Sequence, residues 1–100
     1  MQAENKFEKI RYAHDLVLSF RKKMTQMEVD KITQEILQVG EPAVPFLIQG
    51  FTNEVSIMRG RSANTLARMG KSVTPALKAA RKNGNQRTTY WVDYTLERIK

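Results

Sequence analysis

Residues 36–70 read ILQVGEPAVPFLIQGFTNEVSIMRGRSANTLARMG, and their pattern returns thirty residues later in LARMGKSVTPALKAARKNGNQRTTYWVDYTLERI, residues 66–99. The identical pairs are Gly40 and Gly70, Pro45 and Pro75, Leu47 and Leu77, Asn53 and Asn83, Thr65 and Thr95, Leu66 and Leu96, and Arg68 and Arg98. A fixed period of about 20 to 50 residues is typical of solenoids, in which each unit buries its apolar face against its neighbours. The sequence therefore predicts a repeat architecture.

Two helices are predicted ahead of the repeat. Residues from about 4 to 24 carry an apolar stripe at spacings of three and four, which is typical of an amphipathic helix. The stripe consists of Phe7, Ile10, Ala13, Leu16, Val17, Phe20 and Met24. Thr25 and Glu28 form a capping-box pattern, which predicts a second helix starting beside Thr25. That helix is expected to stop at Gly40, which can adopt the left-handed conformation at a helix end.

The repeated stretch predicts two further pairs of helices. In the first copy a short helix opens at Glu41 and Pro42, because proline is tolerated in the first turn of a helix. A longer helix follows from about residue 54 to Met69, and we expect its inner stripe to be Met58, Ser62, Leu66 and Met69. The second copy repeats the short helix and ends with a helix from about Gln86, which brings Val92, Leu96 and Ile99 inward.

These elements combine into one fold prediction. The chain is expected to be all-α, a short right-handed α-solenoid of about six helices in three antiparallel HEAT-like hairpins. The hairpins cover about residues 4–39, 41–69 and 72–100 within a single domain, 1–100. Each helix is near or below the length of about 12 to 15 residues at which an isolated helix is marginal in water. Stacking must therefore supply the stability.

The middle copy resembles a known repeat. A leucine-x-x-glycine helix end leads through a proline-bearing short helix and an acidic turn to an apolar-arginine pair. The tracts that carry this pattern are residues 36–47, Asn53-Glu54, Met58-Arg59 and residues 63–70. The pattern resembles the HEAT-like repeat of the phycobilisome-lyase type, over roughly residues 36–99 in two copies. The resemblance implies a structural brace between units at Arg59, whereas the last copy has Thr88 and Thr89 in place of the apolar-arginine pair.

Composition narrows the function classes. The chain has no cysteine and one histidine, His14, so a disulfide framework, a thiolate metal site and a cysteine nucleophile are excluded. A Gly-rich phosphate loop is also absent. We predict no catalytic residue, no metal site and no cofactor, and therefore a protein that is not an enzyme. No apolar stretch approaches the roughly 20 residues of a membrane span, and residues 1–9 lack an apolar signal core. The expected location is cytoplasmic, without a membrane partner.

Charge indicates the kind of ligand. The formal net charge is +7. Residues 1–50 carry seven basic and seven acidic side chains, whereas residues 51–100 carry ten basic and three acidic ones. The whole excess therefore lies in the C-terminal half, and a basic surface there favours an acidic partner, either a protein or a nucleic acid.

The outer positions of the last two long helices predict the ligand surface. They combine arginines, which supply charge and fork-shaped hydrogen bonding, with aromatic side chains that are typical interface anchors. The predicted partner-binding residues are Arg61, Asn64, Arg68, Trp91, Tyr94 and Arg98. Trp91 has two interpretations, a partner contact or a seal on the open end of the stack. A secondary basic patch on the short helix and its loops comprises Lys71, Lys78, Arg81, Lys82 and Arg87.

The favoured function is a non-enzymatic scaffold that binds an acidic protein segment through a basic and aromatic concave face, because stacked helices present a rigid groove. The alternative is binding to the backbone of DNA or RNA, for which the net charge is the expected footprint. Against it, the sequence has no helix-turn-helix, zinc or RNA-binding signature. An accessory subunit of a lyase, suggested by the resemblance, ranks third because no catalytic acid or base is visible. The sequence leaves the oligomeric state open.

Overall fold

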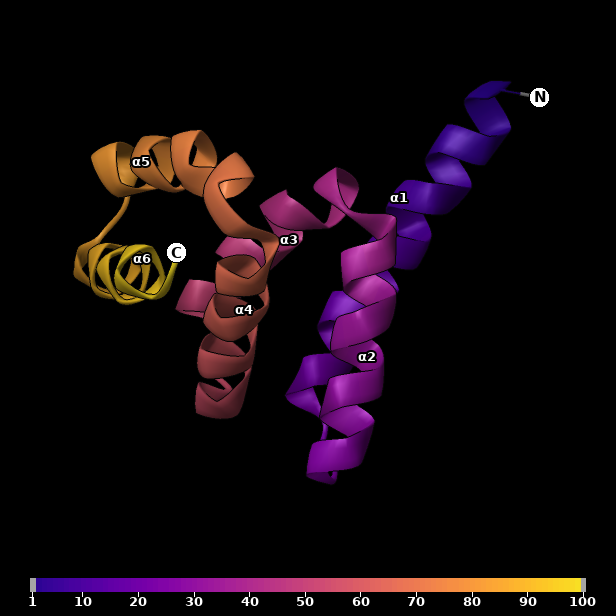
Figure 1. The fold of residues 1–100 in the computed structure, drawn as a ribbon, viewed down its shortest axis with the longest axis horizontal. Coiled ribbons are helices and arrows are strands. Elements are labelled where there is room, and N and C mark those ends of the chain that lie inside the picture. Colours follow the sequence, from indigo (N-terminus) through magenta and orange to yellow (C-terminus); the bar gives the residue numbers. More distant parts are fainter. Residues whose placement is uncertain (1, 100) are drawn as a thin grey trace.

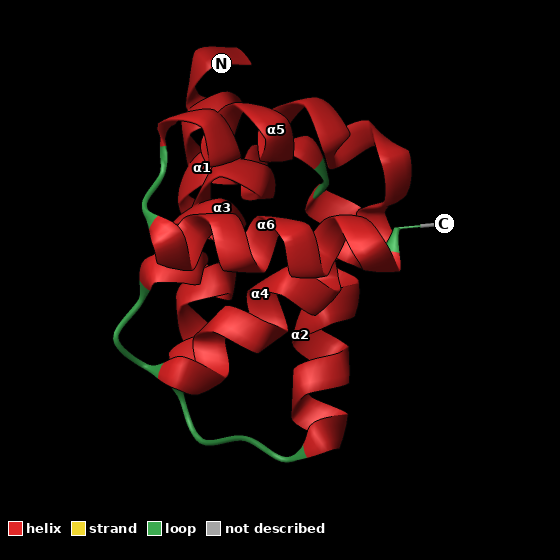
Figure 2. Cartoon of the chain, turned by 90° about the vertical axis from the view of Figure 1, so that its left-hand side faces the viewer, coloured by secondary structure: helices red, strands yellow, loops and turns green. Residues whose placement is uncertain are grey.

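The computed structural model of the chain describes residues 2–99, and side chains from residue 6 onward. Every regular element in this range is a helix, which confirms the predicted all-α class (Figure 2). The elements are α1 (Gln2–Leu18), η1 (Ser19–Arg21), α2 (Gln26–Val39), η2 (Glu41–Ala43), α3 (Val44–Gln49), η3 (Gly50–Thr52), α4 (Ser56–Met69), η4 (Gly70–Val73), α5 (Thr74–Asn83) and α6 (Gln86–Arg98), where η marks a 3-10 helix. Residue 100, where the third predicted hairpin ends, lies outside the described residues, as does Met1.

Helices that are neighbours in sequence lie beside each other in pairs. α1 packs on α2, α3 on α4 and α5 on α6, and Figure 1 shows the three pairs following one another across the molecule in chain order. Between pairs, α3 contacts both α1 and α5, while α4 contacts both α2 and α6. The main contacts therefore join each pair to the next one along the chain.

The helix ends show why the chain turns where it does. Thr25 caps α2 with the predicted capping box, in which its hydroxyl accepts from the Glu28 amide and the Glu28 carboxylate accepts from the Thr25 amide. Gly40 follows α2 with φ 77° and ψ −133°, and Gly70 follows α4 with φ 82° and ψ −157°. The positive φ expected at Gly40 is confirmed, but ψ lies far from the left-handed helical value of about +47°. Glycine tolerates this region of positive φ at little steric cost.

The first helix differs most from its prediction. α1 ends at Leu18 rather than near Met24, and a 3-10 turn leads into extended backbone at Lys22. The chain is extended again at the cap residue Thr25, with φ −71° and ψ 162°. The inward placement of Phe7 and Ile10 is wrong, since Phe7 is 71% exposed and Ile10 37%. The first turns of α1 extend beyond the neighbouring helices, as Figure 1 shows near the N-terminus.

One hydrophobic core runs through all three pairs. Its fully buried large side chains include Phe20 from the first pair, Leu47, Phe51 and Leu66 from the second, and Leu77 and Val92 from the third. Met58 and Ser62 are buried as predicted, whereas Met69, Leu96 and Ile99 are only half-buried against the core. This core holds α4 and α6 in place, and those two helices carry the predicted ligand surface.

Candidate partner-binding site

Three of the predicted ligand residues line one open hollow between α4 and α6. Asn64 and Arg68 reach it from α4, and Arg98 reaches it from the last turn of α6. Its volume is about 500 Å³, and Ala67 and Gly70 complete the lining. All three polar side chains are exposed, and none of the lining residues is acidic. We call this site the Arg68–Arg98 hollow.

Arg98 is held in place by its own helix. Its guanidinium carbon lies 3.4 Å from the centre of the Tyr94 ring, and its Nη1 donates a 3.0 Å hydrogen bond to the Tyr94 carbonyl oxygen. A planar guanidinium stacks well on an aromatic face and still presents its remaining N–H groups to a ligand. Tyr94, half-buried against the core, thus positions Arg98 for the hollow.

Arg61 has a different environment from the two arginines of the hollow. Its Nη1 lies 2.9 Å from the carbonyl oxygen of Phe20 and 2.9 Å from that of Lys22, so it donates to the chain just at the end of η1. The brace expected at Arg59 is local instead, since Arg59 donates to the carbonyl oxygens of Asn53 and Glu54 in the turn before α4. The long-range brace between the first and second pairs is therefore Arg61.

Trp91 lies in a small aromatic cluster rather than in the Arg68–Arg98 hollow. Its ring meets Tyr90 and Tyr94 edge-on, with centroids 5.0 Å apart in each case. The side chain is half-buried and packs against the core, whereas Tyr90 is 61% exposed. Trp91 thus has both a packed side and an open side.

The secondary basic patch is only partly brought together. Its five residues are all exposed, and Lys78, Arg81 and Lys82 line one shallow depression with Thr89 and Leu96. Arg81 forms an ion pair with Asp93, with a 3.1 Å distance between Nε and Oδ1. Lys71 and Arg87 are not part of that depression. The Asp93 carboxylate makes this patch less favourable for an acidic ligand than the Arg68–Arg98 hollow.

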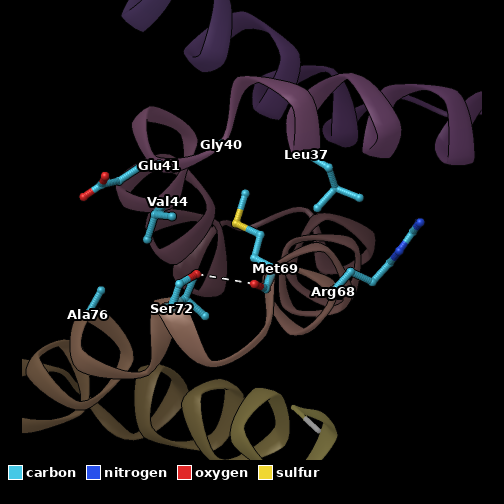
Figure 3. Close-up of a pocket in the computed structure, with 9 residues that line it drawn as sticks. Leu37, Gly40, Glu41, Val44, Arg68, Met69, Ser72 and Ala76 are labelled. Atoms are coloured by element: carbon cyan, nitrogen blue, oxygen red, sulfur yellow. Dashed lines mark hydrogen bonds between the residues drawn. The ribbon is translucent and has the colours of Figure 1, made fainter.

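A second hollow was missed by the sequence analysis. It lies where α2 and α4 end, has a volume of about 640 Å³, and is lined mainly by apolar side chains. The lining consists of Leu37, Gly40, Glu41, Val44, Arg68, Met69, Ser72, Val73 and Ala76 (Figure 3). The available signal was the pair of repeated turns after Gly40 and Gly70, because each turn leaves the side chains around it without a covering helix. We call this site the Leu37–Met69 hollow.

His14 is the histidine of the chain, and it lies on α1 beside an acidic neighbour. His14 Nδ1 lies 3.5 Å from the carboxylate of its neighbour Asp15. The pair is exposed, and the His14 ring meets Phe46 edge-on. Among residues 6–99, whose side chains are described, no three His, Cys, Asp or Glu side chains gather closely enough to hold a metal ion. Within residues 2–99, none of the helices combines the length and apolar character needed to cross a membrane.

Comparison of the chain with family models, curated proteins and solved structures finds no match.

Proposed function

We propose that the chain is a non-enzymatic, right-handed HEAT-like solenoid of three helical hairpins that binds an acidic segment of another protein. The order of helix contacts supports the solenoid, because each pair packs on the next pair along the chain. The similar backbone conformations at Gly40 and Gly70, thirty residues apart, support a repeated structural unit. In such a stack the second helices of the hairpins would form the binding face.

The observation that carries the binding proposal is the convergence of Arg68 and Arg98 on one open hollow without an acidic neighbour in its lining. Arginine pairs with carboxylates through two parallel hydrogen bonds, and such charge-assisted bonds are the strong ones. Asn64 adds an amide that can donate to the same ligand. The hollow therefore suits one or two side-chain carboxylates of an acidic segment.

The Arg68–Arg98 hollow itself favours a protein partner over nucleic acid, because it presents only two arginines. Arg61 is occupied by two backbone carbonyl oxygens and Arg81 by Asp93. Two arginines in a hollow of about 500 Å³ can hold a short carboxylate cluster. A protein that makes about 6 to 10 contacts with DNA phosphates must present basic groups spread along the DNA backbone. An accessory role in a lyase has no catalytic group in the hollow to support it.

The test is binding of a fluorescent poly-glutamate peptide and of a labelled DNA duplex, followed by anisotropy at several salt concentrations. The proposal expects peptide binding that weakens about tenfold or more in Arg98→Gln, since hydrogen bonds to charged groups contribute about 1.5–3 kcal/mol. Arg87→Gln, which makes the same charge change at the other end of α6, should retain the affinity. Tighter binding of the duplex, with a steep salt dependence that both variants reduce equally, would overturn the proposal in favour of nucleic acid.

A further inference from the structure

The Leu37–Met69 hollow and the Arg68–Arg98 hollow share one wall. Arg68 lines both, and the chain passes directly from Met69 in one hollow to Gly70 in the other. The two sites therefore form adjacent compartments on either side of the end of α4. A single extended segment crossing this helix end would meet both.

The two compartments differ in chemistry. Figure 3 shows the Met69 side chain rising into the Leu37–Met69 hollow and Leu37 reaching toward it from α2. Val44, Val73 and Ala76 supply further apolar lining. The Ser72 hydroxyl donates to the Met69 carbonyl oxygen within the turn. An aliphatic side chain fits such a site, and the flexible thioether of Met69 can adapt to its shape.

The charged groups at the rim determine which ligand residues can lie next to that aliphatic side chain. Figure 3 shows Arg68 at the rim beside Leu37, with its guanidinium directed away from the hollow. Glu41 lies at the opposite rim and is also directed outward. An acidic residue is thus attracted on the Arg68 side and repelled on the Glu41 side. The rim accepts an acidic group at one end of the hollow only.

We infer that the ligand is an acidic-apolar segment, whose carboxylates bind Arg68 and Arg98 while a neighbouring leucine-like side chain enters the Leu37–Met69 hollow. This inference rests on the proposed function, because it names the partner class of the same surface. It adds a specificity that charge alone does not give. Acidic segments without an aliphatic residue bind the surface more weakly.

Two short labelled peptides test the inference. One has glutamates on one side of a leucine and serines on the other side, and the second peptide has serine in place of the leucine. The unmodified chain should bind the leucine peptide about tenfold more tightly, because transfer of part of a leucine side chain from water contributes about this much. Leu37→Gln should remove the difference in affinity between the two peptides.

A second variant tests the same inference independently, so that a folding defect in Leu37→Gln does not decide the result. Ala76→Leu fills the same hollow from α5 and should also remove the preference for the leucine peptide, with thermal unfolding followed by circular dichroism for both variants. Equal affinities of the unmodified chain for the two peptides would overturn the inference, while a loss in Arg98→Gln would still support the acidic-segment proposal. An Arg98→Gln variant that binds both peptides as the unmodified chain does would overturn the proposed function itself.

Discussion

The side chain of Arg61 donates a 2.9 Å hydrogen bond to the backbone carbonyl oxygen of Phe20, forty-one residues earlier in the chain. The same nitrogen donates to the carbonyl oxygen of Lys22. Both carbonyl groups belong to the segment in which the chain leaves η1. This one side chain therefore connects α4 to the end of η1. The bond is a tertiary contact between two helical pairs, and it uses charge that would otherwise serve a ligand.

We therefore expect Arg61→Gln to lower the free energy of unfolding by about 1.5–3 kcal/mol, the range for hydrogen bonds to charged groups. Urea unfolding followed by circular dichroism measures the change. Arg68→Gln is the matched control, because Arg68 is exposed and its loss should stay within about 0.5 kcal/mol. Equal destabilisation by the two substitutions would show that the Arg61 contact contributes nothing specific.

Gly50 and Ser62 make a second close approach between segments. Gly50 is buried in η3, and a Cβ atom placed on it would collide with the Ser62 hydroxyl on α4. We expect Gly50→Ala to destabilise the fold by about 1–3 kcal/mol through overpacking. Ser62→Ala removes a buried hydroxyl that has no hydrogen-bond partner. The double variant should recover part of the lost stability, and a strictly additive result in urea unfolding would contradict the collision.

These two contacts mark the limit of what the sequence could predict. The start and end of α2 could be predicted from the sequence, because the signals for them, the capping box at Thr25 and the glycine after the helix, involve residues only a few positions apart. The sequence could not predict whether Arg59 or Arg61 is the long-range brace. The answer depends on how closely η1 approaches α4, and that distance is set by packing.

The position of the Arg68–Arg98 hollow was predictable in part. Arg68 and Arg98 occupy equivalent positions in the repeat and Asn64 lies one helical turn before Arg68, so the phase of α4 and α6 grouped the three residues that line the hollow. The Leu37–Met69 hollow was not predicted, since it arises where α2, α3, α4 and α5 meet the 3-10 turns η2 and η4. Its lining residues are spread from residue 37 to residue 76, and only the two repeated turns after Gly40 and Gly70 relate them to one another.

Phe7 and Phe20 offer a test of the corrected position of α1. Both belong to the same apolar stripe, but Phe7 is 71% exposed and Phe20 is fully buried. Phe20→Ala should cost about 3–5 kcal/mol, as is usual for a buried aromatic side chain. Phe7→Ala should change the unfolding free energy by less than about 0.5 kcal/mol. A large loss from Phe7→Ala in urea unfolding would mean that the start of α1 is packed against something in solution.

Substitutions at Trp91 and Tyr90 distinguish the two interpretations of Trp91, a partner contact or a seal on the open end of the stack. Because Trp91 packs against the core, Trp91→Ala should lower stability by about 2 kcal/mol or more, and the exposed Tyr90→Ala by much less. We expect the affinity of the Trp91 variant for the acidic peptide to stay within about twofold at a temperature where it remains folded. Loss of peptide binding with unchanged stability would instead identify Trp91 as a partner contact.

The capping box predicts how acid affects α2. Hydrogen bonds from the backbone and side chain of Thr25 hold the pKa of the Glu28 carboxyl below its ordinary value. A carboxyl with a lowered pKa in the folded state adds stability that is complete above the unfolded pKa and is lost as pH falls through the folded pKa. Thr25→Ala removes the hydroxyl and should move the Glu28 pKa back toward the ordinary value, as measured by NMR titration. An unchanged Glu28 pKa in that variant would show that the hydroxyl has no part in stabilising the carboxylate.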